Sequence, residues 1–219
     1  MGTITRSLSN NITTGGVILP AGITNSSVSA VTSFANASGG TLILLSTQTA
    51  SASATISFTT GLDSTYDEYI FKFINVRPAT DSVDFEFQGS TNGGSTYGVT
   101  ITSTSFEAYH DEADSSAGFQ YDTNTDLAQS TSYQNLSNNL GNASDKCIGG
   151  YLTLTNPSST TYVKHFIGQV TRLTSNDYNG NDLTAGYFNT TTAINAIRFR
   201  MTSGNIADGI FKLYGVKKS

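Results

Sequence analysis

The chain of 219 residues has little charge and a single cysteine, with Lys, Arg, Asp and Glu making up only 12% of it. Because Cys147 has no partner in the sequence, no internal disulfide can form, which suits assembly in a reducing cytoplasm. No stretch approaches the roughly 20 apolar residues that cross a membrane, and the first residues lack the pattern of a secretion signal. We therefore expect neither secretion nor membrane insertion.

The longest uncharged segment lies between Arg6 and Asp63, where 56 residues contain no Lys, Arg, Asp or Glu. A free solvated tail usually carries charge and few aliphatic residues. This segment instead contains apolar clusters that can be buried against other protein, and we predict that residues 1–50 form an extended N-terminal docking arm. The residues expected to make its contacts are Val17, Ile18, Leu19, Leu42, Ile43 and Leu44.

Catalytic motifs are absent too: the sequence has no Gly-x-Ser-x-Gly, no His-Glu-x-x-His and no phosphate-binding Gly-x-x-x-x-Gly-Lys. We expect a non-enzymatic protein without a cofactor, although a pair of carboxylates for glycan cleavage is compatible with any chain that has sixteen acids. The acidic run 107–114, with His110, contains ligand types that bind metals, but a solvated loop explains it equally well. Residues 122–126 begin like a calcium loop, which Leu127 and Tyr133 then break. We predict no metal site, and leave open whether calcium binds an acidic loop.

What the chain has in abundance is threonine, with 33 residues, and serine, with 28. Thr is β-branched and favours strands, while Ser competes with helical hydrogen bonds. Apolar and polar residues alternate strictly at 83–88, which is typical of a strand with one buried face. Similar segments are 54–58, 69–74, 151–155, 162–171, 187–189, 197–201 and 210–216. Short strands with Gly, Asn, Asp and Ser connections predict an all-β fold, an antiparallel β-sandwich of jelly-roll type over residues 51–219.

Two connections carry specific predictions. Asn92-Gly93 tolerates positive φ, and we expect a hairpin there that joins 83–88 to 97–102. Residues 111–146 have weak periodicity and many turn residues, so we predict a long loop or insertion, with a short helix at 126–129.

Charge is segregated along the chain. Residues 78–145 contain ten acids and no Lys or Arg, whereas residues 146–219 contain eight basic and three acidic residues. An acidic surface repels phosphate, which argues against a nucleic-acid partner. We expect the acidic block to face outward, and the basic C-terminal third to neutralise it within the fold or in a neighbouring subunit. Arg198 and Arg200 share one face of their strand and are the expected partners of strand 83–88.

Exposed tyrosines supply the remaining candidate sites. Tyr97, Tyr109 and Tyr121 have the ring type that stacks on sugars, and core filling or subunit contact is the alternative role for each.

Two regions carry a resemblance. Residues 56–69, then 71–78 with the Gly-rich segment that ends at Tyr97, and the C-terminal stretches 194–199 and 204–216, resemble virion proteins of tailed bacteriophages, especially marine ones. The resemblance implies a β-sandwich structural protein of the virion, assembled in the host cytoplasm. We expect a capsid decoration or cement protein that binds the major capsid protein as a homo-oligomer, with a trimer favoured. The alternative is a short tail fibre or receptor-binding module that joins tail proteins and recognises host glycans.

Overall fold

The structure is a computed structural model that describes residues 12–13, 16–17 and 41–218. The chain divides into two units, Met1–Gly39 and Gly40–Ser219. In the first unit, β1 (Ile12–Thr13) pairs with β2 (Gly16–Val17) in an antiparallel ladder. The second unit holds β3 to β14.

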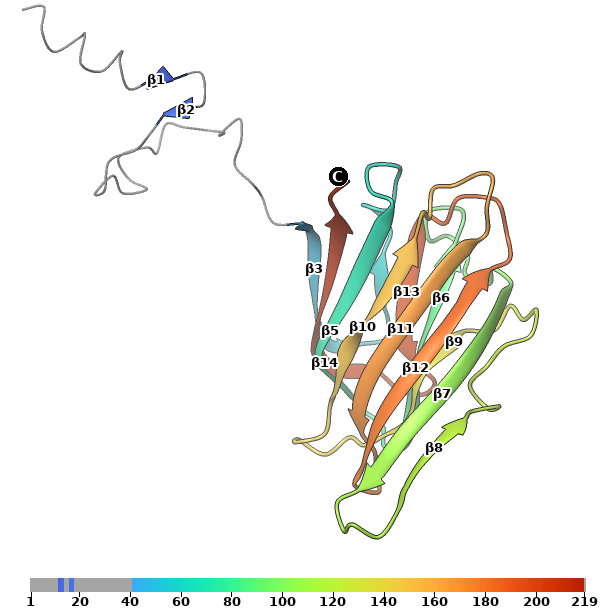
Figure 1. Ribbon diagram of the computed structural model, residues 1–219. Helices are drawn as coiled ribbons and strands as arrows, with labels where there is room; N and C mark the ends of the chain where they lie inside the picture. The colour runs from blue at the N-terminus through green and yellow to red at the C-terminus, as the bar shows by residue number, and fades with distance from the viewer. Residues whose placement is uncertain (1–11, 14–15, 18–40, 219) are drawn as a thin grey trace, which may run out of the picture. The chain divides into compact units, whose positions relative to one another are not determined.

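The second unit consists of two antiparallel sheets packed face to face, which confirms the predicted all-β sandwich (Figure 1). The larger sheet, called the large sheet below, has eight strands. In spatial order they are β3 (Leu42–Ser53), β14 (Ile206–Val216), β5 (Glu68–Pro78), β10 (Ile148–Thr155), β11 (Lys164–Leu173), β12 (Tyr178–Phe188), β7 (Ile101–Asp111) and β8 (Ala117–Tyr121). The small sheet has four strands, in the order β4 (Ile56–Phe58), β13 (Ala196–Met201), β6 (Val83–Ser90) and β9 (Gln134–Leu140). The jelly-roll connectivity remains a prediction.

Phenylalanine rings fill the interior between the sheets. The ring of Phe199, on the small sheet, lies 5.1 Å from that of Phe73 and 5.4 Å from that of Phe71, both on β5. It also stacks on Phe85 at 5.8 Å and reaches Phe211 of β14 at 5.7 Å. All five rings are buried, because the alternation of each strand directs them to the shared face. This aromatic cluster is the centre of the core.

The boundary of the N-terminal arm was predicted wrongly. Residues 42–53 form β3 and pair with β14, so residues 42–50 belong to the sheet and not to an extended arm. The uncharged composition hid this strand, because it contains many small polar residues between its apolar ones. Ile18 and Leu19 lie outside the described residues, and Val17 lies in β2.

The expected loop over 111–146 also needs correction, since it contains two strands. β8 pairs with β7 to form a hairpin, and β9 pairs with β6 in the small sheet. Neither follows a strict apolar alternation: β9 reads Gln134-Asn135-Leu136-Ser137-Asn138-Asn139-Leu140. No helix occurs at 126–129 or elsewhere in residues 41–218, and hence none that is suited to cross a membrane.

The predicted hairpin between 83–88 and 97–102 is wrong as well. Gly93 and Gly94 do form a turn with φ of 71° and 86°. The chain then passes from β6 in the small sheet to β7 in the large sheet, so the two strands are not neighbours. A turn signal shows where the chain reverses, but it does not show whether the next strand joins the same sheet.

The expected charge pairing is confirmed in two places. Arg200 lies directly opposite Glu86 in the ladder between β13 and β6, and the two side chains form an ion pair. Arg172 pairs with Glu107. The acidic block does not simply face outward, however, because Glu86, Glu107, Asp111 and Asp122 are all buried.

Candidate interaction surface

The face of the large sheet that points away from the small sheet carries an unusual number of apolar side chains. Large hydrophobic residues exposed on this outer face are Leu42, Leu44, Ile74, Phe119, Tyr121, Ile167 and Leu183. A solvated sheet face normally alternates apolar-in with polar-out, and clustered exposed apolar groups mark interaction sites. We call this face, from β3 to β8, the outer face.

Strand register explains how these side chains come together. Thr104, Ala185 and Ile167 lie opposite one another on β7, β12 and β11, and the same row continues through Thr153 and Ile70. It then crosses Tyr214 and reaches Leu44 at the edge of the sheet. One row of side chains therefore runs across nearly the whole sheet, and Ile167, near its middle, is 52% exposed.

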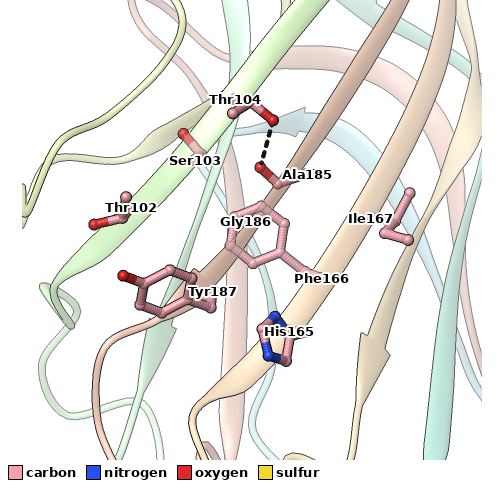
Figure 2. Close-up of a pocket in the computed structure, with 9 residues that line it drawn as sticks. All are labelled: Thr102, Ser103, Thr104, His165, Phe166, Ile167, Ala185, Gly186 and Tyr187. Carbon is pink, nitrogen blue, oxygen red and sulfur yellow. Dashed lines mark hydrogen bonds between the residues drawn. The ribbon is translucent and has the colours of Figure 1, made fainter.

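A shallow hollow of about 460 Å³ interrupts this row (Figure 2). His165 and Tyr187 form one wall, with ring centroids 5.9 Å apart, and Ile167 forms part of the other. Ala185 is small, and Thr104 donates a hydrogen bond from its hydroxyl to the carbonyl of Ala185 at 3.4 Å. The lining is mostly apolar, which suits a protein side chain better than a charged metabolite.

Gly186, at the base of this hollow, leaves room for side chains and backbone of the neighbouring strands β7 and β11. A Cβ atom there would lie 2.8 Å from the ring of Phe166 and 2.5 Å from the carbonyl oxygen of Thr102. The absence of a side chain on the inner side thus lets Phe166 fill the core beneath.

Lysines add positive charge to the outer face. Lys72 and Lys212 lie directly opposite one another on β5 and β14, and neither forms an ion pair within residues 41–218. Lys72 packs over the ring of Tyr151 at 4.8 Å. Like charges opposite each other in a sheet are destabilising, so an acidic group on a partner would relieve this repulsion.

Both edges of the large sheet contribute predicted residues. On β3, Leu44 is 51% exposed, Leu42 is also exposed and Ile43 is half-buried. On β8, Tyr121 donates a hydrogen bond from its hydroxyl to Asp126 at 2.6 Å, which raises the pKa of Tyr121. Beside it, Phe119 stacks on Phe106 at 6.0 Å and is 75% exposed.

The other two predicted tyrosines lie elsewhere. Tyr97 packs beneath the guanidinium of Arg198 at 3.9 Å, next to the small sheet, and its hydroxyl is buried. Tyr109 projects from the inner side of β7, where its ring meets that of Tyr178 at 5.9 Å. The predicted residues therefore do not converge on one site. Sequence reasoning missed His165, Ile167, Leu183 and Tyr187 as site residues. The predicted strand segments 162–171 and 187–189 contain three of them, and Leu183 lies outside every predicted segment.

A buried ion cluster lies between the sheets, on the inner side of β7, β11 and β12. Arg172 donates to Glu107 Oε2 at 2.7 Å and to Asp182 Oδ1, and Ser137 donates to Asp182 Oδ2 at 2.8 Å. Burial raises the pKa of Asp182, with the nearby Arg172 opposing this effect. Gly180 makes room for the arginine, because a Cβ atom there would lie 2.7 Å from Arg172 Cζ.

The acidic run around His110 does not assemble into a ligand set. Successive residues of β7 point to opposite faces, so Glu107 and Asp111 face inward while His110 faces outward toward Asp114. In the described part of the chain, no three His, Cys, Asp or Glu side chains are grouped to hold a metal.

No family model, no curated protein and no solved structure matches this chain. The geometry of the outer face and of the interior therefore carries the functional argument.

Proposed function

We propose that this chain is a non-enzymatic structural subunit of a bacteriophage virion, a capsid decoration or cement protein, which docks on other protein subunits through the outer face. The observation that carries the proposal is the one-sided exposure of apolar side chains across the large sheet. Burying such area contributes roughly 25 cal/mol per Å². Lys72 and Lys212, which form no ion pair in the described part of the chain, favour a partner surface that combines apolar patches with carboxylates.

The role of the N-terminal segment is part of the same proposal. Residues 1–40 contain one charged side chain, Arg6, and would add contact area on neighbouring capsid subunits. The assembled subunit would be a homo-oligomer, with a trimer as the favoured form, and the major capsid protein as the partner.

Particle occupancy tests this proposal. Ile167→Glu and Leu183→Glu place carboxylates on the outer face without disturbing the core, and we expect each to reduce the amount of protein bound to purified particles by tenfold or more. Tyr162→Glu is the matched control, since Tyr162 is 70% exposed but lies in the loop between β10 and β11. Equal occupancy for all three variants would remove the outer face from the proposal.

Deletion of residues 2–40 tests the arm separately. We expect a folded sandwich with reduced occupancy, because β3 begins after the deletion. Unchanged occupancy would show that the arm makes no contribution to docking.

A second candidate is a short tail fibre or receptor-binding module that recognises host glycans. It is favoured by a polar hollow that one of the predicted tyrosines, Tyr109, lines. Quantified band stoichiometry on a gel of purified particles separates the two: a high copy number supports the head, and a low copy number supports the tail.

A further inference from the structure

A polar hollow of about 320 Å³ opens beside the buried ion cluster. It is lined by side chains from both sheets, including Tyr109 and Glu107 of β7, Gln120 of β8, Asn138 of β9, and Tyr178 of β12. Its volume is at the lower end of the range for small-ligand sites, roughly 300–1,000 Å³. We call it the polar hollow.

The polar hollow offers many hydrogen-bonding groups that the protein itself does not use. Within residues 41–218, no hydrogen bond is recorded for the hydroxyls of Tyr109 and Tyr178, for Gln120 Oε1 or for Asn138 Oδ1. The tyrosine hydroxyls can donate to or accept from a ligand hydroxyl, and the amide oxygens can accept from one. Arg172 is 6% exposed, and its Nε–H is a buried donor without an acceptor in the same residues.

Local structure holds these groups in place. Gly118 lies opposite Tyr109, and a Cβ atom at that position would lie 2.7 Å from the tyrosine hydroxyl oxygen. Gln120 donates from Nε2 to Glu107 Oε1 at 2.5 Å, and Asn138 donates from Nδ2 to Asp122 at 2.9 Å. The hydrogen bond of each amide nitrogen fixes the orientation of the amide group. The amide oxygen is left free to bind a ligand.

The charges argue against an ionic ligand. Arg172 is the only cation among the lining side chains, and two carboxylates already compensate it. Glu107 in turn uses one oxygen for Arg172 and the other for Gln120. An anion would meet uncompensated negative charge, and a cation would find no free carboxylate oxygen on Glu107.

We propose that the polar hollow binds a neutral sugar, whose hydroxyls pair with the free amide and phenol oxygens and whose C–H face packs on Tyr109 and Tyr178. Neutral amides and tyrosines suit such a ligand, because they match hydroxyl groups without a desolvated charge. The second candidate function, recognition of host glycans, supplies only the biological role of this sugar binding. Sugar binding is a property of the isolated chain, so failure of the particle experiments leaves it intact.

Saturation-transfer NMR on the full-length chain tests the inference. The probes are the methyl glycosides of glucose, galactose, mannose and N-acetylglucosamine, with N-acetylneuraminic acid as the anionic comparison. We expect saturable binding of at least one neutral glycoside and weaker binding of the anion. If no neutral glycoside binds, or if the anion binds more tightly, the inference is wrong.

Variants locate the binding site. Loss of one neutral hydrogen bond should weaken the affinity between about twofold and tenfold, so we expect this for each of Tyr109→Phe, Gln120→Ala and Tyr178→Phe, and loss of detectable binding for the triple variant. Tyr162→Phe and Gln169→Ala, outside the polar hollow, are the matched controls. The two tyrosine variants should keep the thermal unfolding temperature of the parent. Gln120→Ala also removes the hydrogen bond to Glu107, so its affinity and that of the triple variant are measured well below their own unfolding temperatures. Unchanged affinity in the triple variant would place the sugar elsewhere and overturn the assignment.

Discussion

Two regions of the interior between the sheets are filled by different kinds of side chain. Around Phe199 the space is filled by phenylalanine rings, whereas around Arg172 it is filled by an arginine and two carboxylates. The side chains of both regions are buried. The aromatic region gains free energy from burying apolar area, while the ionic region must recover the cost of desolvating its charges. The aromatic region therefore supplies stability, and the ionic region supplies a fixed polar arrangement at the end of the sandwich that opens to the polar hollow.

Removal of the Phe199 ring should have the largest effect on the free energy of unfolding. Phe199→Ala leaves a cavity among rings contributed by both sheets, and we expect a loss of about 4 kcal/mol in the free energy of unfolding, within the range for buried Phe-to-Ala changes. Urea denaturation measures it. Phe119→Ala, at an exposed phenylalanine, should cost less than about 1 kcal/mol. Similar losses for the two variants would contradict the assignment of the core.

Removal of the buried arginine should come next. Arg172→Met leaves Glu107 and Asp182 without a countercharge, and we expect a loss of about 3 kcal/mol at neutral pH. This loss lies near the lower end of the range for breaking a buried ion pair, about 3–5 kcal/mol, because one carboxylate can take up a proton.

Replacement of the whole ion cluster sharpens this comparison. Arg172→Met combined with Glu107→Leu, Asp182→Leu and Ser137→Ala converts the ionic region to an apolar one and leaves no buried partner unpaired. We expect it to regain most of the stability lost in the single variant. If the combined variant is as unstable as Arg172→Met, the lost stability came from packing and not from unpaired charge.

The pH dependence of stability should distinguish the two regions further. Burial raises the pKa of Asp182 above its ordinary 3.8, so the folded state binds more protons than the unfolded state between the two pKa values. The contribution of Asp182 to stability is therefore greatest in acid and decreases as the pH rises through its folded pKa. Asp182→Asn removes this titration, so we expect the stability of the variant relative to the parent to increase as the pH rises from about 4 to 7. Thermal unfolding across this range measures it, and parallel curves would argue against a raised pKa.

The smallest effect should come from the ion pair that the sequence predicted between strands β13 and β6, in which Glu86 is buried and Arg200 is partly exposed. Arg200 pairs with Glu86 and packs on the ring of Tyr133 at 3.8 Å, but its side chain is 42% exposed. We expect Arg200→Ala to cost about 1 kcal/mol or less, as for other cross-strand pairs. The same denaturation measurement checks it, and a loss comparable to that of Arg172→Met would mean that exposure does not weaken the pair.

Particular strands show where sequence reasoning succeeded and where it failed. β6 and β13 were predictable, because Val83 to Gln88 alternate strictly and the arginines of β13 occupy one face. β3 and β9 were missed, because small and polar residues fill positions that a longer apolar alternation would need. The outer face was missed for another reason. A strand such as β11 shows alternation, but its sequence does not tell which of its faces remains exposed.

The sequence by itself determined that the second unit is an all-β sandwich, because threonine-rich alternation with turn residues between short segments leaves few other ways to bury the aromatic rings. It also determined that charge would pair between the acidic block and the basic C-terminal third. Only the tertiary structure decided which strands are neighbours, that Arg172 is buried with two acids from β7 and β12, and that Tyr109, Gln120 and Tyr178 surround one hollow. These depend on long-range strand pairing, and pairing is fixed by the packing of both sheets together and not by any local pattern.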